Sequence, residues 1–547
     1  MPRTLSPSAL QPLFASALLF TTAPLLAQTW TPVMAAAPEP VGLCLLLTDG
    51  GVMCQAGPRW YRLTPNSTGS YAQGSWSSLA PFPVGYEPDA YASAVLADGR
   101  VLVVGGEYNS GNFALANQGA IYDPRVDQWA AVPPPPSTGT PNHWQCIGDA
   151  PAALLPDGRL AVGSKLYQDV AAYDPKSASW SLLASSGKDD TLNSEEGWTL
   201  LADGSVFTLE VARAPAAERL LVAPGATSGQ WVSAGSTPED LHTPTTVVGG
   251  IQAPGCPLYY PPGEIGPTLL RPDGTVFAVG ATGHTGIYTP AKSASGTGTW
   301  TAGPAVPGGL NVEDGPGAVL PNGHVLFGAS PGDSGSGLKY FEFDGTSLAA
   351  VPGPGNAAGD ATYFTSLLVL PTGQVLFVDG STTVELYTPS SATGPAVAWR
   401  PTVTSVATAL VRGTSYPISG TQFNGLTSGS AYGDESQNAT NYPLVRLTNV
   451  ATGHVYYART HDHSTMAVAT GAASVATTFD VPVTIETGAA TLEVVANGIA
   501  STTVQVSIAS PPAPPPSSRS GGGGGGAMAL VELVLLAALA FGRRLRR

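Results

Sequence analysis

The chain has 547 residues, of which 66 are glycine, 51 are proline and only 11% are charged. This composition suits a protein with many turns and disfavours long helices. The 38 acidic residues outnumber the 23 basic residues, and such a surface would repel nucleic acid. A nucleic-acid partner is therefore not expected.

The N-terminus has the composition of a signal peptide. An apolar stretch follows Arg3 and ends in Ala-Pro-Leu-Leu-Ala27. We therefore expect residues 1–27 to be removed when the protein is exported.

A short turn between two apolar runs occurs seven times, at a spacing of about 50 residues. Asp-Gly or Asn-Gly between such runs is the strongest short-range signal for a β-hairpin. The sequence thus predicts seven hairpins, with turns at Asp49-Gly50, Asp98-Gly99, Asp157-Gly158, Asp203-Gly204, Asp273-Gly274, Asn322-Gly323 and Thr372-Gly373.

Several repeats continue with a tyrosine that ends one strand and a tryptophan in the next. The pairs are Tyr122 and Trp129, Tyr173 and Trp180, Tyr288 and Trp300, and Tyr387 and Trp399. Together with the hairpin they make four strands, and a repeat near 50 residues is typical of kelch-type propellers. The sequence therefore predicts an all-β fold with a seven-bladed kelch-type β-propeller over residues 28–399. Trp30 could supply the fourth strand of the last blade, although Trp399 competes for that place.

The four cysteines are not expected to form a disulfide framework, because a core of this size needs no cross-links. A two-residue turn at Asp49-Gly50 would pair residue 45 with residue 54. Cys44 and Cys54 would then face opposite sides of their hairpin. A bridge between Cys146 and Cys256 is an open alternative, since spacing does not test it.

The C-terminal part contains three further segments. Residues 400–508 alternate apolar and polar positions between turn residues, which suits an immunoglobulin-like sandwich. Residues 509–526 form a linker rich in proline, serine and glycine. Residues 527–547 hold an apolar run and then a basic tail.

This tail allows two interpretations. It resembles the glycine-rich sorting signals of Gram-negative bacteria, which rhombosortase-type intramembrane proteases cut. The alternative is a plain membrane anchor, although its apolar run is shorter than the roughly 20 residues that a stable spanning helix needs. By the positive-inside rule the basic tail stays cytoplasmic and the propeller lies outside. Both interpretations predict a protein at the cell surface or in the medium of a Gram-negative bacterium.

A propeller followed by a sandwich, with three motifs in the sandwich, resembles the galactose oxidase and glyoxal oxidase superfamily over residues 28–508. The motifs are Tyr432-Gly433-Asp434, residues 441–446 (Asn-Tyr-Pro-Leu-Val-Arg) and residues 459–466 (Arg-Thr-His-Asp-His-Ser-Thr-Met). The resemblance implies an early-set sandwich. The enzymes of this superfamily are copper-radical oxidases, in which imidazole and phenolate ligands hold the metal and a cysteine is cross-linked to the radical tyrosine.

Counting from the turns tests whether the oxidase residues are present. Cys146 matches the cross-linked cysteine, but Glu195 stands at the place of the radical tyrosine. The Tyr-His pair of the family reads Tyr363-Phe364. Because Phe364 cannot bind a metal and Glu195 cannot form a stable radical, the resemblance implies a catalytically degenerate member for which copper is not expected. Of the C-terminal ligands, His461 matches and His463 competes with it.

The same counting places three carboxylates eight residues before their turns, at Asp149, Glu195 and Asp314. Innermost strands of a propeller begin at the mouth of its channel, so these side chains should meet there, near the loop with His461 and His463. One interpretation is a solvated mouth whose carboxylates accept hydrogen bonds from backbone amides. A second is a calcium site with the three carboxylates as ligands. The third is a hydrolytic or lyase centre in which one of the histidines assists a carboxylate.

These observations favour an exported, surface-associated and non-catalytic propeller that binds carbohydrate or another extracellular ligand, or that scaffolds the envelope. The expected ligand-binding residues are Asp149, Glu195, Asp314, His461 and His463. Carbohydrate is expected by superfamily analogy alone. The alternative function is oxidation of sugars or small aldehydes at an altered copper site.

Overall fold

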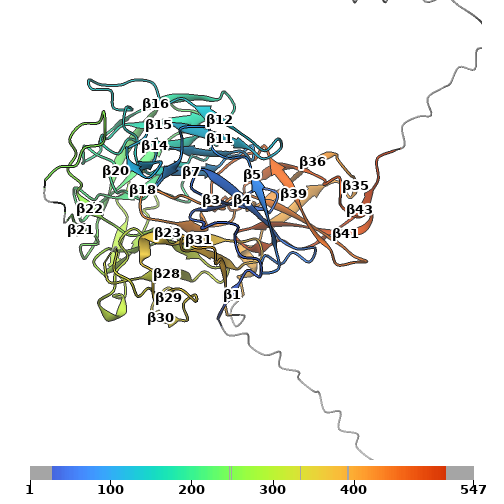
Figure 1. Cartoon of the computed structure of the whole chain (residues 1–547). Helices are drawn as coiled ribbons and strands as arrows, with labels where there is room; N and C mark the ends of the chain where they lie inside the picture. The colour runs from blue at the N-terminus through green and yellow to red at the C-terminus, as the bar shows by residue number, and fades with distance from the viewer. Residues whose placement is uncertain (1–27, 246, 248, 333, 391–393, 513–547) are drawn as a thin grey trace, which may run out of the picture. The chain divides into compact units, whose positions relative to one another are not determined.

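A computed structural model describes residues 28–512, except for 246, 248, 333 and 391–393. Strands dominate these residues (Figure 1), and their helical elements are three 3-10 turns, η1 (Pro307–Gly309), η2 (Thr362–Phe364) and η3 (Val397–Trp399). The predicted all-β class is confirmed. The predicted signal peptide, the segment 527–547 and most of the linker lie outside the described residues. Within the part of the chain that is described, no helix is long and apolar enough to cross a membrane.

Seven antiparallel sets of four strands precede residue 390 in the described chain. The first three are β2 (Cys44–Leu46), β3 (Val52–Ala56), β4 (Arg59–Thr64) and β5 (Ser75–Leu79); β7 (Ala92–Val95), β8 (Val101–Val104), β11 (Gly119–Asp123) and β12 (Gln128–Val132); and β13 (Ala152–Leu154), β14 (Leu160–Gly163), β15 (Val170–Asp174) and β16 (Ser179–Ser186). The fourth is β17 (Thr199–Leu200), β18 (Val206–Leu209), β19 (Ala216–Val222) and β20 (Ser228–Ser236), and β20 also pairs with β16.

The remaining sets follow the same order. They are β23 (Thr268–Leu270), β24 (Val276–Val279), β25 (Thr285–Thr289) and β26 (Thr299–Ala302); β27 (Gly317–Val319), β28 (Val325–Ala329), β29 (Lys339–Phe343) and β30 (Leu348–Val351); and β31 (Ser366–Val369), β32 (Val375–Val378), β33 (Glu385–Thr388) and β1 (Thr29–Pro32). Short strands β6 (Pro88–Asp89), β9 (Tyr108–Asn109), β10 (Asn112–Phe113), β21 (Thr243–Pro244) and β22 (Gly263–Glu264) lie between sets. The first strands of neighbouring sets contact one another in the order β7, β13, β17, β23, β27, β31 and β2.

All seven predicted hairpins are present, but their turns are one residue longer than expected. In the first hairpin the amide of Leu47 donates to the carbonyl of Gly51, and Gly50 adopts a φ of 76°. Residues 48–50 therefore form a three-residue loop, of the kind that ends in a left-handed glycine. The longer loop pairs Cys44 with Cys54, and the two form a disulfide. The prediction that they face opposite sides was wrong, because a single additional loop residue changes the register.

The N-terminal strand completes the last set. β1 pairs with β33, and Trp30 lies opposite Tyr387. Trp30 packs against Tyr340, Phe377 and Tyr387, and its indole N–H donates to the carbonyl of Pro352 at 2.6 Å. The strand partner of Tyr387 is thus Trp30 and not Trp399, which lies in η3 instead.

The C-terminal strands have their own apolar core, which includes Ile418, Val445 and Phe479. They are β34 (Thr402–Val406), β35 (Ala409–Val411), β36 (Ser415–Thr421), β38 (Leu444–Asn449), β39 (Val455–His461), β40 (Val475–Asp480), β41 (Gly488–Ala496), β42 (Ile499–Ala500) and β43 (Val504–Ala509). They form one continuous path of paired strands, with β42 paired to β41 beside it.

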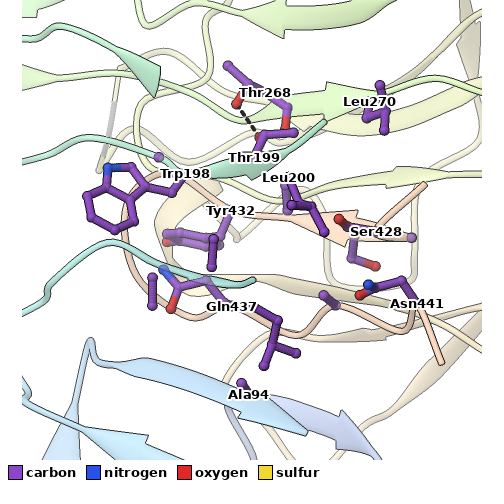
Figure 2. Close-up of a pocket in the computed structure, with 18 of the residues that line it drawn as sticks. Ala94, Trp198, Thr199, Leu200, Thr268, Leu270, Ser428, Tyr432, Gln437 and Asn441 are labelled. Atoms are coloured by element: carbon purple, nitrogen blue, oxygen red, sulfur yellow. Dashed lines mark hydrogen bonds between the residues drawn. The ribbon is translucent and has the colours of Figure 1, made fainter. Parts of the chain in front are cut away.

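One segment between β36 and β38 runs among the first strands of the other sets. We call residues 428–441 the inserted segment. Its strand β37 (Ser430–Ala431) pairs with β27, and the amide of Asn438 donates to the carbonyl of Leu367 at 2.8 Å. A cavity of about 60 Å³ separates part of it from the first strands, with Leu200, Leu270 and Tyr432 in its lining (Figure 2). The inserted segment thereby brings residues from the C-terminal part to the sites where the first strands begin.

Candidate functional site

A buried lysine joins two of the predicted carboxylates. Lys165 lies in the turn between β14 and β15, and its ammonium is 2.6 Å from Oε1 of Glu195. The same ammonium contacts Oδ2 of Asp149. These carboxylates lie just before β13 and β17, so the first strands of two neighbouring sets begin at the same charged group. The predicted convergence of Asp149 and Glu195 is confirmed.

Two hydroxyl groups complete the surroundings of Glu195. Ser194 Oγ and Tyr259 Oη each donate to Glu195 Oε1 at 2.9 Å, and the two hydroxyls also contact each other. Glu195 itself has a φ of 57°, a left-handed conformation that is uncommon outside glycine. Such backbone strain persists where the surrounding contacts over-determine a residue, and it is frequent at functional sites.

The inserted segment adds two more acidic residues. Asp434 is fully buried, and its oxygen lies within 4.8 Å of the ligand atoms of Asp149 and Glu195. A second group within the same limit comprises Asp314, Asp434 and Glu435. Asp434 therefore links all three predicted carboxylates. We call Lys165, Asp149, Glu195, Asp314, Asp434 and Glu435 the acidic cluster.

Close backbone approach explains the glycine before Asp434. A Cβ atom at Gly433 would lie 2.5 Å from Oδ1 of Asp314. A Cβ atom at Gly197 would lie 2.2 Å from the carbonyl oxygen of Gly433. Both positions exclude a side chain, so the Tyr432-Gly433-Asp434 motif allows the inserted segment to pass between the strands that carry Glu195 and Asp314.

Burial controls the charge of the cluster. It raises the pKa values of Asp149, Asp314 and Asp434 well above the ordinary range, because carboxylates lose hydration there. Burial also opposes ionisation of Glu195, but the Lys165 ammonium and the hydrogen bonds from Asp434, Lys165 and Ser194 together outweigh burial and lower the pKa of Glu195. For Lys165, the attraction of Asp149 and Glu195 outweighs burial and raises its pKa. Lys165 and Glu195 are therefore charged, whereas Asp149, Asp314 and Asp434 hold protons more readily than ordinary carboxyl groups unless a cation replaces those protons.

The histidines lie elsewhere. The amide of Thr460 donates to the carbonyl of Thr48 and that of His463 to the carbonyl of Ala97, so the 460–463 loop rests on the hairpin turns. The turns are at the opposite ends of the first strands from Asp149 and Glu195. The expectation that His461 and His463 lie near these carboxylates was wrong, because the inserted segment and not this loop reaches the cluster.

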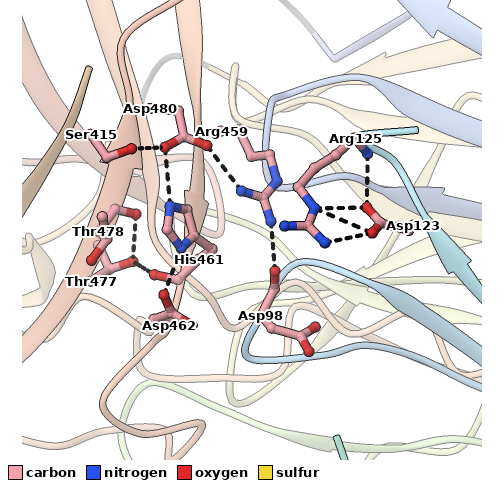
Figure 3. A network of polar contacts seen from close by, with 10 residues as sticks. All are labelled: Asp98, Asp123, Arg125, Ser415, Arg459, His461, Asp462, Thr477, Thr478 and Asp480. Carbon is pink, nitrogen blue, oxygen red and sulfur yellow. Dashed lines mark hydrogen bonds and ion pairs between the residues drawn. The ribbon is translucent and has the colours of Figure 1, made fainter. Parts of the chain in front are cut away.

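His461 belongs to a separate polar network (Figure 3). Its Nδ1 is 2.8 Å from Oδ2 of Asp462, and its Nε2 is 3.1 Å from Oδ1 of Asp480. Arg459 joins Asp480 to the carbonyl of Asp98 in a hairpin turn. This network attaches the loop to the turns, as expected for an ordered histidine bonded to Asp462.

The structure also shows the contacts of the other residues that match oxidase positions. Cys146 forms a disulfide with Cys256, so the open alternative of a bridge is confirmed and the thiol is not free for a cross-link to tyrosine. Tyr363 and Phe364 are exposed and have ring centroids 3.9 Å apart. The carbonyl of Tyr363 accepts a hydrogen bond from the Tyr432 hydroxyl at 2.7 Å.

Copper does not fit the residues at this site. Copper(II) favours imidazole and thiolate ligands. Among the described residues, each group of side chains close enough to hold a metal contains carboxylates alone. The Lys165 ammonium also lies between two of these carboxylates.

Sequence reasoning missed Lys165, Tyr259 and Glu435. No local pattern marks the first two, since each lies in a turn or loop far along the chain from its partners. The Tyr432-Gly433-Asp434 motif was a usable signal, because a glycine before an acidic residue indicates close backbone approach. Its resemblance to a superfamily motif alone does not indicate this role.

Comparisons with known proteins give a structural likeness. No family model and no curated protein matches the chain. A fungal alcohol oxidase of the AA5 family, solved with copper, is 14% identical, with a TM-score of 0.50 over 88% of this chain and 100% of that one. The extracellular domain assigned to a hybrid two-component system of B. thetaiotaomicron is 10% identical, with a TM-score of 0.41 over 89% and 60%. The chain therefore shares its all-β fold with that AA5 alcohol oxidase.

Proposed function

We propose that the chain is an exported, surface-associated and non-catalytic member of the galactose oxidase-like superfamily that binds carbohydrate. In this proposal residues 28–399 form a seven-bladed kelch-type propeller and residues 400–508 an early-set sandwich. The seven sets of four strands and the likeness to the AA5 alcohol oxidase support it. The binding site is the end of the propeller where the first strands begin.

The distribution of exposed aromatic side chains carries the proposal. Among the described residues, the exposed aromatic side chains are Tyr108, Tyr260, Tyr363 and Phe364. Tyr260 follows Tyr259, which donates to Glu195, and Tyr363 accepts from Tyr432 of the inserted segment. Tyr108 lies near enough to Asp149 for that carboxylate to raise its pKa, after the larger effects of Glu107 and burial. Each of the four thus belongs to a segment that reaches the acidic cluster or its neighbours.

Aromatic rings around carboxylates suit a sugar. The apolar face of a sugar ring packs on an aromatic ring, and its hydroxyl groups donate to carboxylates. Of the carboxylates here, Glu107, Glu264 and Asp314 are partly exposed and can meet such hydroxyls. Because the site is rich in acids, neutral sugars and amino sugars are favoured over uronic acids.

A screen of the full chain on immobilised glycans tests this function. We expect binding to a neutral or amino-sugar glycan, and at least a tenfold loss of affinity in Tyr260→Ala and Phe364→Ala, since each removes a stacking surface. Val483→Ala is the matched control, because Val483 is an exposed apolar side chain in the loop between β40 and β41. It should bind as the wild type does.

Two results would overturn the proposal. The first is the absence of glycan binding, or binding that both aromatic variants retain. The second is release of hydrogen peroxide from galactose, glyoxal or methylglyoxal after copper loading, which would establish the oxidase alternative.

A further inference from the structure

The acidic cluster has far more negative than positive groups. Lys165 pairs with Asp149 and Glu195, whose oxygens it contacts directly. No ion pair to a basic side chain is found for Asp314, Asp434 or Glu435 in the described part of the chain. Buried carboxylates so close together are costly unless protons or a cation compensate them.

One oxygen of Asp434 has no donor. Oδ1 accepts the backbone N–H of Glu435 at 2.9 Å, whereas Oδ2 is buried and accepts no hydrogen bond from an N–H or hydroxyl group. The polar groups close to the Asp434 carboxyl are the carboxyl groups of Glu195 and Glu435, with which it can share only a proton. Asp434 is fully buried, and its ligand atom lies within 4.8 Å of those of Asp314 and Glu435. A buried acceptor of this kind is rare without a compensating ligand.

In a second acidic group of the same chain, a lysine compensates the buried carboxylates. Asp190, Glu196 and Glu210 also lie within 4.8 Å of one another. There the side chain of Lys188 is buried, and its ammonium is 2.7 Å from Oε1 of Glu196 and 2.8 Å from Oε1 of Glu210. That group has a lysine in direct contact, as do Asp149 and Glu195, whereas the ion pairs of the described residues give Asp314, Asp434 and Glu435 none.

We propose that Asp314, Asp434 and Glu435 bind a divalent metal ion, with calcium as the preferred one. The three residues offer oxygen ligands only, which hard cations such as calcium prefer. Glu264, whose Oε2 is also buried without a partner, is a further oxygen donor beside Asp314. The partly exposed Asp314 provides the route of entry from solvent. These ligands differ from the predicted calcium ligands Asp149, Glu195 and Asp314. The Lys165 ammonium lies between Asp149 and Glu195, where a metal ion would otherwise bind.

The inserted segment gives such a site a structural role. Asp434 and Glu435 come from the C-terminal part, whereas Asp314 lies before the first strand of the sixth set. A cation shared by the three residues would hold the inserted segment to that strand. The site does not depend on the proposed binding of carbohydrate.

Metal analysis of the full chain tests the site. After incubation with calcium and removal of free metal, we expect about one calcium per chain in the wild type. Asp434→Asn and Asp314→Asn should lose it, because each removes a charged ligand. Calcium at 100 times its Kd should raise the melting temperature of the wild type by about 3 °C and that of Asp434→Asn by none.

A control variant and a stability measurement distinguish loss of the metal site from unfolding. Asp190→Asn changes the lysine-containing group and should keep the metal. Asp434→Asn should melt no lower than the metal-free wild type, because it replaces a buried protonated carboxyl group by a neutral amide of the same size, so loss of metal would not reflect unfolding. Absence of bound calcium in the wild type, or equal metal content in all variants, would show that protons compensate the cluster. Glycan binding by a chain without metal would leave the proposed function intact.

Discussion

Burial lowers the pKa of two basic side chains of this protein, but their neighbours differ and so does the net result. Lys165 stays charged because two carboxylates contact its ammonium. His463 has no carboxylate partner, and its Nδ1 is 2.8 Å from the hydroxyl of Thr477. Burial and the nearby His461 lower the pKa of His463 to about 3. A buried base therefore needs an acidic partner to remain charged.

His463 makes the stability depend on pH. Its pKa is lower in the folded than in the unfolded chain, so its contribution is fully present above pH 6.5 and is lost as the pH falls toward 3. At pH 5 the loss is about 2 kcal/mol. Between pH 7 and pH 5, His463→Gln should lose correspondingly less free energy of unfolding than the wild type, as measured with a chemical denaturant. His284→Gln, which changes an exposed histidine, should behave as the wild type. An equal loss in all three proteins would contradict the assignment.

At the scale of elements, one loop geometry recurs in all seven hairpins. The residue before each loop donates its N–H to the carbonyl four residues later, and the glycine of each turn has a φ between 76° and 90°. In six of the seven turns an aspartate or asparagine oxygen also accepts the N–H two residues later. The side chain and the glycine together fix the register of each strand pair.

Gly50 and Gly274 allow the cost of a left-handed backbone to be measured apart from the cost of a steric clash. Gly50 and Gly274 have φ values of 76° and 84°, but an added Cβ would lie 2.5 Å from Tyr457 at Gly50 and would meet open space at Gly274. Gly274→Ala should therefore cost about 1 kcal/mol for the left-handed backbone alone. Gly50→Ala should cost about 2 kcal/mol more, because Tyr457 must move. Thermal or denaturant unfolding of both variants gives the comparison, and equal costs would show that Tyr457 moves freely.

At the scale of the whole molecule, the N-terminal strand joins the two ends of the series of strand sets. β1 lies next to β33, more than 350 residues later in the sequence, and supplies the last strand of that set. Trp30 holds it there through three aromatic contacts and a hydrogen bond. Opening this strand would expose the edge of β33.

Trp30→Ala should therefore destabilise the protein by about 3 kcal/mol, since it removes an aromatic side chain from a packed cluster. Trp399→Ala is the matched control. Trp399 lies in η3 beside Gly323 and pairs with no strand, so its loss should cost clearly less. The denaturant midpoints of unfolding of the two variants measure this difference in stability. A larger effect of Trp399 would mean that β1 is not the closing strand in solution.

Much of the fold was predictable because its signals are local. Each hairpin depends on a few consecutive residues, and the Tyr-Trp partners in adjacent strands, such as Tyr122 with Trp129, follow from the same repeat. The register of Asp149, Glu195 and Asp314 relative to the turns likewise predicted that they meet. The pairing of Cys44 with Cys54 was mispredicted, because one loop residue decides which side chains face each other.

The sequence by itself determined the all-β class, the seven hairpins and the convergence of Asp149 with Glu195. Only the tertiary structure decided which charges meet there. Lys165, Tyr259 and Asp434 come from different parts of the chain, and no spacing rule relates a turn, a loop and an inserted segment. It also placed His461 and His463 at the opposite ends of the first strands. Desolvation and ion pairing depend on neighbours in space, so the chemistry of this site is defined by contacts between segments that the sequence keeps far apart.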